Sequence, residues 1–292
     1  MAAHGPIGVI GLGLMGSALA ARLTGAGIAV TGFDIDRARC AALKEIGGEA
    51  AASAAQVMAR CQTIIVAVFN AAQVELLLDE LGHEPHFAGS VMVCTTTSSP
   101  EDIVRIAKHA GDAGLGFVEA PISGTSAELR DGAALALVSG RSDAIDAVQP
   151  VLNVICPQQM RLGRIGNAAR TKLALNLILQ NNRAALAEGI AFAESMGLDA
   201  AAFLATARRS AAYSRAMDSK GEKMLARDFA PQSHIAQTLK DSELILEEAR
   251  QQEQHLPMTL IQTGLLRSAI TLVGPEADSA AVIEAIRPSK NR

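Results

Sequence analysis

Two polar residues interrupt an otherwise apolar stretch, RTKLALNLILQ, between Arg170 and Gln180. Lys172 and Asn176 are four positions apart and Gln180 follows after four more, so a helix places all three side chains on one face. A lysine that is withdrawn from water holds its proton less tightly and is suited to exchange a proton with a substrate oxygen. The alternative is a lysine at the edge of the core, with its stem buried and its ammonium in solvent.

A glycine-rich turn near the N-terminus is typical of a dinucleotide site. The segment IGVIGLGLMGSALAARL reads as a strand, a turn with glycines at 11, 13 and 16, and a helix. The first glycine permits the tight turn, the second lets the backbone approach a pyrophosphate, and the third allows close packing, so that the helix N-terminus faces the anion. A turn without any ligand is the alternative. The predicted cofactor-binding residues are Gly11, Leu12, Gly13, Leu14, Met15 and Gly16.

Asp34 ends the second predicted strand, in GFDIDRARC, about twenty residues beyond the glycines. A carboxylate at this place accepts hydrogen bonds from the adenosine ribose and repels a 2′-phosphate, which favours NAD over NADP. Arg37 and Arg39 leave NADP open, because either side chain could turn towards a phosphate. The sequence therefore predicts an NAD site in which Asp34 selects the cofactor.

The sequence pattern changes near residue 163 and predicts two domains of different kinds, which together carry the residues named above. Residues 1–163 alternate short β-rich runs with helical segments, which predicts an α/β fold: a Rossmann-type, doubly wound, mostly parallel sheet covered on both faces. Residues 164–292 show only helical periodicity, beginning with a long interdomain helix from Gly166 to Met196. We expect a dinucleotide-binding domain followed by an all-helical substrate and oligomerisation domain.

Composition limits the partners of the chain. Its 292 residues carry a formal net charge of −4, so we expect no nucleic-acid partner. The N-terminus lacks a basic segment followed by a long apolar core, and later apolar runs of membrane-spanning length are broken by a charge or glycine, which predicts a cytoplasmic protein without a membrane partner. The four cysteines are widely spaced, which favours reduced thiols over a metal site.

Six segments of the chain follow one another in the order seen in a known enzyme family: GLGLMGSALAARL, VFNAAQV, TTTSSP, EAPISGTSAELRDGAALAL, GNAARTKLALN and FAPQSHIAQTLKDSELIL. Over essentially its whole length the chain resembles the β-hydroxyacid dehydrogenases, the family of 3-hydroxyisobutyrate dehydrogenase and tartronate semialdehyde reductase. The resemblance implies that Lys172 transfers the proton and that Asn176 helps to hold the substrate. It also implies a homodimer or homotetramer built through the helical domain.

The same resemblance gives roles to five other residues. Ser123 and Gly124 match the loop that grips the substrate carboxylate, and a hydroxyl beside exposed N–H groups suits that anion. Asn70 and Thr96 match positions that line the cofactor, each at the carboxyl end of a predicted strand. Lys240 matches a lysine near the nicotinamide and the active site.

Some positions depart from the family pattern. Thr125 stands where a second glycine is usual, Phe69 where proline is common, and Leu175 where a polar residue is common. The phrases NAAQV and FAPQSH, with Ser233 where many relatives carry phenylalanine, look most like the branch that contains L-threonate dehydrogenase.

We therefore predict an NAD-dependent dehydrogenase of a small hydroxy acid, with a four-carbon sugar acid such as L-threonate as the leading substrate. 3-Hydroxyisobutyrate and tartronate semialdehyde are the alternatives within the family. An imine reductase shares the architecture but generally lacks the lysine, so Lys172 argues against it. A catalytically silent dinucleotide-binding module that recruits partners is the alternative of another class.

Overall fold

The structure is a computed structural model, and it describes residues 5–81, 87 and 89–287. The chain divides into two compact units, unit 1 with residues 1–172 and unit 2 with residues 173–292. The division falls inside one long helix, α8 (Asn167–Ser195), which continues from the first unit into the second. The domain boundary expected at residue 163 precedes this helix and stays a prediction.

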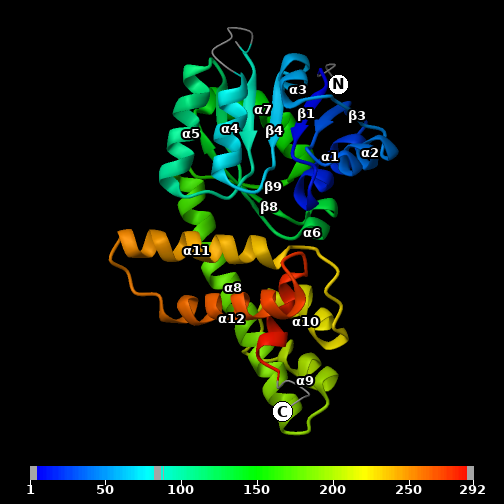
Figure 1. The fold of residues 1–292 in the computed structure, drawn as a ribbon, viewed down its shortest axis with the longest axis vertical. Helices are drawn as coiled ribbons and strands as arrows, with labels where there is room; N and C mark the ends of the chain where they lie inside the picture. The colour runs from blue at the N-terminus through cyan, green and yellow to red at the C-terminus, as the bar shows by residue number, and fades with distance from the viewer. Residues whose placement is uncertain (1–4, 82–86, 88, 288–292) are drawn as a thin grey trace. The chain divides into compact units, whose positions relative to one another are not determined.

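The described residues of unit 1 form one nine-stranded sheet (Figure 1). Its strands are β1 (Ile7–Ile10), β2 (Val30–Phe33), β3 (Glu49–Ala50), β4 (Thr63–Val66), β5 (Val91–Cys94), β6 (Gly116–Glu119), β7 (Ile122–Ser123), β8 (Leu135–Gly140) and β9 (Gln158–Arg161). The order is β3-β2-β1-β4-β5-β6-β8-β7, with β9 paired to β8. Strands β1 to β6 are parallel, and β8 runs antiparallel to both β6 and β7. The Rossmann-type sheet predicted from the sequence is confirmed.

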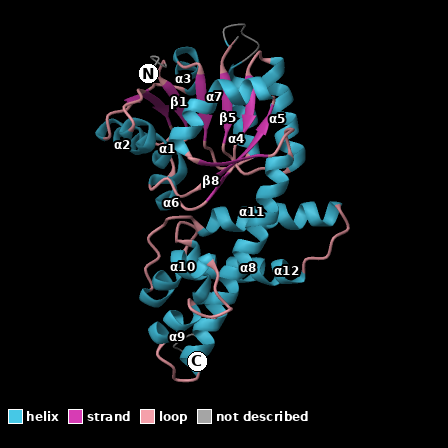
Figure 2. Ribbon diagram, turned by 180° about the vertical axis from the view of Figure 1, so that it is seen from behind, coloured by secondary structure: helices cyan, strands magenta, loops and turns pink. Residues whose placement is uncertain are grey.

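Helices cover both faces of this sheet (Figure 2). They are α1 (Leu14–Gly25), α2 (Arg37–Glu45), α3 (Ala54–Arg60), α4 (Ala71–Leu81), α5 (Pro100–Asp112), α6 (Ser126–Arg130) and α7 (Ser142–Ile155). On one face α1 and α7 bury side chains such as Leu19 and Val148, and on the other α4 and α5 bury side chains such as Leu78 and Ile106. Because both faces are buried, the strands read as continuous apolar runs in the sequence.

Unit 2 is helical throughout its described residues. After α8 come α9 (Ala200–Ala207), α10 (Arg215–Ala226), α11 (Ile235–Gln251), α12 (Pro257–Val273) and the 3₁₀ helix η2 (Ser279–Ala285). β geometry in this described part is limited to an isolated bridge between His234 and Asp278. Apolar side chains such as Ile190, Leu204 and Leu266 form a separate core. The all-helical second part of the chain and its long first helix are confirmed.

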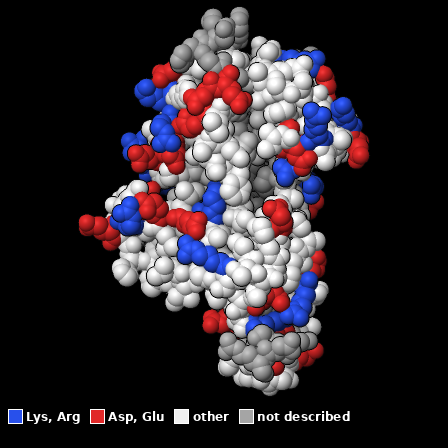
Figure 3. Space-filling model, viewed as in Figure 1, with Lys and Arg blue, Asp and Glu red and all other residues white. Residues whose placement is uncertain are grey.

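Acidic and basic side chains lie interspersed on the face drawn in Figure 3. Several charges of the molecule are paired at the surface, such as Arg267 with Glu243 at 2.9 Å and Arg208 with Glu222 at 2.8 Å. Exposed pairs of this kind contribute little to stability, because water screens them. Among the helices that the structure describes, none has both the length and the apolar character needed to cross a bilayer.

Candidate active site

The glycine-rich turn joins β1 to α1 at the carboxyl end of β1. Gly11 has a φ of 88°, and a Cβ there would lie 2.6 Å from the carbonyl oxygen of Ala67, so this position requires glycine. A Cβ on Gly16 would lie 1.8 Å from the Gly11 carbonyl oxygen, so the close packing of α1 requires glycine as well. A Cβ on Gly13 would come no closer than 3.6 Å to the rest of the fold, which leaves this stretch of backbone open to a ligand.

The N-terminus of α1 is arranged to bind an anion. Gly13 caps the helix without a side-chain hydrogen bond, and the first turn of α1 carries no acidic residue. The N–H groups of this turn, which includes Leu14 and Met15, need acceptors from outside the helix and form the positive end of its dipole. These observations fit the pyrophosphate of a dinucleotide.

Asp34 follows β2 and binds the glycine-rich turn directly. Its buried carboxylate accepts hydrogen bonds from the N–H of Leu12 at 2.7 Å, from the N–H of Asp36 at 2.8 Å and from Arg39 Nη1 at 3.3 Å. Because a carboxylate offers about four acceptor positions, one remains for a ribose hydroxyl. Arg39 is half exposed beside it. A carboxylate with a remaining acceptor position and a cation that suits a phosphate therefore lie side by side.

Asn70 and Thr96 follow β4 and β5, further along the same edge of the sheet. The Asn70 Oδ1 accepts a hydrogen bond from the N–H of Gln73 at 3.0 Å, and the Thr96 hydroxyl donates to the Val68 carbonyl at 3.0 Å. Asn70 therefore fixes the start of α4, and Thr96 joins the segment after β5 to the segment after β4. The glycine-rich turn, Asp34, Asn70 and Thr96 are brought together at the carboxyl edge, where ligands of open parallel sheets bind.

Lys172 lies near the start of α8, and only 6% of it is exposed. Its Nζ donates a hydrogen bond to the carbonyl oxygen of Ile122 at 2.7 Å. Ile122 and Ser123 form β7, and Gly124 follows directly. Unit 1 therefore brings Lys172 close to the segment that carries Ser123 and Gly124.

The residues after Ser123 explain one departure from the family pattern. Gly124 has a φ of 147°, and a Cβ there would lie 3.0 Å from the Cβ of Ala134, so glycine is needed. Thr125 begins α6 with a capping box: its hydroxyl accepts from the N–H of Glu128 at 3.2 Å, and the Glu128 carboxylate accepts from the N–H of Thr125 at 2.7 Å. The threonine that replaces a glycine here thus stabilises the helix after the loop.

Asn176 lies one turn beyond Lys172 on α8 and belongs to unit 2. Its Nδ2 donates to Asp241 Oδ2 at 2.9 Å, and the Lys240 Nζ lies 3.0 Å from the other oxygen of the same carboxylate. Asp241 of α11 therefore links two predicted site residues. Asp241 is not among the residues predicted from the sequence, although its place directly after Lys240 was an available signal.

Gln180 is the third residue on the polar face of α8, and its side chain is buried and hydrogen-bonded inside unit 2. It is 4% exposed, and its Oε1 accepts hydrogen bonds from the Ser242 hydroxyl at 2.5 Å and from Gln262 Nε2 at 3.0 Å. These bonds join α8 to α11 and α12 inside unit 2. The residue therefore contributes to the polar interior of the helical unit.

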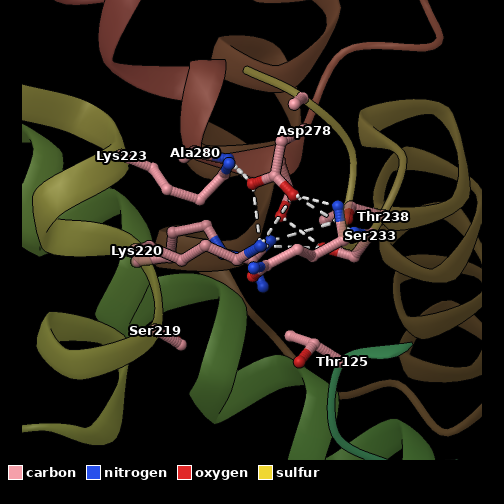
Figure 4. A network of polar contacts seen from close by, with 12 residues as sticks. Thr125, Ser219, Lys220, Lys223, Ser233, Thr238, Asp278 and Ala280 are labelled. Atoms are coloured by element: carbon pink, nitrogen blue, oxygen red, sulfur yellow. Dashed lines mark hydrogen bonds and ion pairs between the residues drawn. The ribbon is translucent and has the colours of Figure 1, made fainter. Parts of the chain in front are cut away.

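A buried ion pair lies in another part of unit 2 (Figure 4). The Lys220 Nζ is 2.7 Å and 2.9 Å from the two oxygens of Asp278, which also accept hydrogen bonds from three backbone N–H groups. Burial lowers the pKa of Lys220 to about 8, and repulsion by the Arg183 guanidinium adds to this. Burial alone would raise the pKa of Asp278, but the Lys220 charge and the hydrogen bonds outweigh it and lower that pKa.

The cysteines are free thiols, three of them buried. Burial raises the pKa of Cys94 to about 12 and that of Cys156 to about 11, so neither thiol forms a thiolate at neutral pH. Both groups are therefore unsuited to act as nucleophiles.

A cavity of about 720 Å³ opens at the amino ends of β1, β2 and β3. Lys44, Glu49 and Arg60 are among its lining residues. Open parallel sheets bind their ligands at the carboxyl ends of the strands, where the glycine-rich turn and Asp34 lie. We therefore do not assign this cavity to the cofactor.

Known protein families match both parts of the chain. Residues 6–163 match the NAD binding domain of 6-phosphogluconate dehydrogenase, and residues 166–286 match the family described as NAD-binding of NADP-dependent 3-hydroxyisobutyrate dehydrogenase. Together with the Rossmann sheet and the open glycine-rich turn, these matches define an NAD(P)-dependent oxidoreductase.

Individual relatives match nearly the whole length of this chain. It is 32% identical to 2-(hydroxymethyl)glutarate dehydrogenase of Eubacterium barkeri, over 95% of this chain and 93% of the relative, and 29% identical to L-threonate dehydrogenase of Cupriavidus necator, over 95% of each. Among solved structures, 3-hydroxyisobutyrate dehydrogenase from Salmonella typhimurium is similar with a TM-score of 0.87 and 26% identity, over 95% of this chain and 98% of that one. The chain belongs to the β-hydroxyacid dehydrogenase family and acts on the CH–OH group of a hydroxy acid.

Proposed function

We propose that this dehydrogenase oxidises a small hydroxy acid with Lys172 as its general base. The observation that carries the proposal is the 2.7 Å hydrogen bond from Lys172 Nζ to the Ile122 carbonyl, which holds the amine beside Ser123 and Gly124. Lys172 takes the proton of the substrate hydroxyl during oxidation and returns it during reduction. A bound NAD(P) supplies the hydride acceptor.

Four other side chains or backbone groups orient the substrate in this proposal. The Ser123 hydroxyl and the N–H groups near Gly124 hold the substrate carboxylate. Asn176 orients the reacting hydroxyl or Lys172, and its bond to Asp241 at 2.9 Å supports this role because it fixes the amide group. Lys240 adds positive potential; the Asp241 carboxylate, 3.0 Å away, fixes the ammonium and offsets part of that potential.

We propose that NAD is preferred over NADP. The support is the Asp34 carboxylate, which keeps one acceptor position for a ribose hydroxyl and repels a 2′-phosphate. Arg39 at 3.3 Å is neutralised in part by the same carboxylate, which weakens its pull on a phosphate. Initial rates with both cofactors test this directly.

A four-carbon sugar acid such as L-threonate is our leading substrate. The support is the 29% identical L-threonate dehydrogenase and the phrases NAAQV and FAPQSH. An absorbance assay of NADH or NADPH formation should compare L-threonate with 3-hydroxyisobutyrate and 2-(hydroxymethyl)glutarate, and NADH or NADPH consumption should be followed with tartronate semialdehyde. If one of the other acids gives the highest kcat/KM, that acid replaces L-threonate as the proposed substrate, and the proposed type of reaction stands.

The decisive experiment for the mechanism is Lys172→Ala. Removal of a general base costs about 10²–10⁴ in kcat, while NADH binding and folding should persist because the change adds no volume. The control is Lys108→Ala, whose side chain is 78% exposed on α5 and should leave kcat unchanged. A Lys172→Ala enzyme that keeps more than about a tenth of wild-type kcat, with hydride transfer rate-limiting, would remove Lys172 from the mechanism.

We also propose that the enzyme assembles as a homodimer or homotetramer. Exposed apolar side chains on α12 support this: Met258 is 65%, Leu260 61% and Ile261 67% exposed. Apolar groups that cluster at a surface mark contact sites between proteins. Multi-angle light scattering should give a mass of two or four chains, and Ile261→Lys should lower it.

A further inference from the structure

Glu119 lies buried at the start of the helix that carries Lys172. It ends β6, and only 1% of it is exposed. Its Oε2 accepts a hydrogen bond from the N–H of Gly166 at 2.7 Å, and its Oε1 accepts one from the N–H of Ala169 at 2.5 Å. The carboxylate thus satisfies N–H groups that a helix cannot satisfy by itself.

The partner of Glu119 across the sheet binds the same helix end. Ser139 of β8 is paired with Glu119 in the antiparallel register, and its hydroxyl accepts a hydrogen bond from the N–H of Ala168 at 3.1 Å. Burial raises the pKa of Glu119 above its ordinary value, and the backbone N–H groups that its carboxylate accepts from offset only part of this rise. One cross-strand pair therefore caps α8 with a carboxylate and a neutral hydroxyl.

The chain that leaves Glu119 leads directly to the proposed catalytic groups. Three residues later Ile122 accepts the Lys172 hydrogen bond, and Ser123 follows. The same short segment therefore holds the first turn of α8 at Glu119 and the amine of Lys172 at Ile122. A shift of α8 against β6 would move Lys172 relative to Ser123.

We propose that Glu119 is the positioning residue of Lys172, because its carboxylate fixes the first turn of α8 in register with the loop that holds the substrate. This rests on the catalytic role proposed for Lys172. The carboxylate also offsets the positive end of the α8 dipole, so its charge favours a protonated amine on that helix. A substitution that keeps the shape but removes the charge should change both position and potential.

The test compares Glu119→Gln with Ser139→Ala. Glutamine turns an N–H₂ group towards one of the two N–H donors, so α8 loses an acceptor and the nearby negative charge. We expect kcat to fall by about tenfold to a hundredfold, with the KM for cofactor within about twofold, because small displacements of reacting groups have effects of this size. The acid limb of the kcat profile for oxidation should move to lower pH.

Ser139→Ala is the matched control at the same helix end. It removes a neutral acceptor, so it should lower the melting temperature and leave the acid limb in place. If the two variants lose similar stability and neither moves the acid limb, Glu119 is a structural cap only and the proposal is overturned.

If Glu119→Gln fails to fold, Glu119→Asp is the test. This variant keeps the charge on a shorter side chain, so kcat should fall while the acid limb stays at the same pH. Unchanged kcat in that variant would also overturn the proposal.

An independent readout separates this inference from the proposed reaction. In protein without cofactor, labelled with ¹³C at lysine Cε, the Lys172 resonance should titrate at lower pH in Glu119→Gln than in the wild type. This shift would show that the Glu119 charge acts on the Lys172 amine, and it can be measured whether or not Lys172→Ala keeps activity. An unshifted resonance in an active enzyme would reject the inference and leave the reaction standing.

Discussion

Replacing Lys220 with methionine should change how the stability of unit 2 depends on pH. The charged groups that act on this ammonium are Asp278, Arg183 and Lys223, and burial with the two like charges lowers its pKa from 10.5 to about 8. Well below its folded pKa of about 8 the lysine is protonated in both folded and unfolded chains, so its burial cost is constant. Between the two pKa values the unfolded chain binds more protons, so the free energy of unfolding rises with pH.

The size of the effect follows from the same shift. One pKa unit corresponds to about 1.4 kcal/mol, so the wild type should gain about 2 kcal/mol over Lys220→Met between about pH 7 and about pH 9.5. Tyr213, the one tyrosine in a chain without tryptophan, lies in unit 2 and reports its urea unfolding by fluorescence. The buried thiols titrate alike in the wild type and in Lys220→Met, so their contributions cancel in the difference between the two free energies of unfolding. A difference that stays constant or shrinks as the pH rises would refute this reasoning.

Other predictions concern the cofactor turn and the substrate loop. Asp34→Ala should narrow the ratio of kcat/KM values for NAD and NADP; a wild-type preference of about tenfold for NADP would contradict its role. Ser123→Ala should raise the KM of the hydroxy acid markedly and spare NADH affinity, because a hydrogen bond to a charged group contributes about 1.5–3 kcal/mol; equal wild-type rates on an acid and its uncharged alcohol analogue would count against it. Gly16→Ala should abolish cofactor binding, since its Cβ would lie 1.8 Å from the Gly11 carbonyl oxygen, and fluorescence titration that finds normal NADH affinity would disprove this.

The parts of the fold that the sequence predicts have local causes. The requirement for glycine at 11 and 16 arises within a single strand, turn and helix, so it can be recognised from spacing alone. The helix expected from Gly166 to Met196 is observed as Asn167–Ser195 for a similar reason: its periodicity is continuous and Gly197 follows it. Long, regular elements leave a pattern that later packing does not alter.

The partners of the proposed site residues had no such local signal. Lys172 binds a carbonyl that is 50 residues away, Asn176 binds a carboxylate 65 residues away, and Glu119 reaches N–H groups 47 and 50 residues away. These contacts depend on the register of β6 against β8 and on the packing of α8, which a single sequence does not reveal. From the sequence alone, Glu119 is therefore an ordinary polar residue at the end of a buried strand.

The Leu12 N–H donates a hydrogen bond to Asp34, so in the proposed site the residue that selects the cofactor also holds the turn that binds the pyrophosphate. An engineer who replaced Asp34 with alanine to admit NADP would free Arg39 for the extra phosphate and at the same time leave the Leu12 N–H without its acceptor. The variant would then accept NADP, but its glycine-rich turn would be less well held and would bind both NAD and NADP more weakly. A redesign should keep an acceptor at this position, as Asp34→Asn does, so that the charge is removed and the turn retains its anchor.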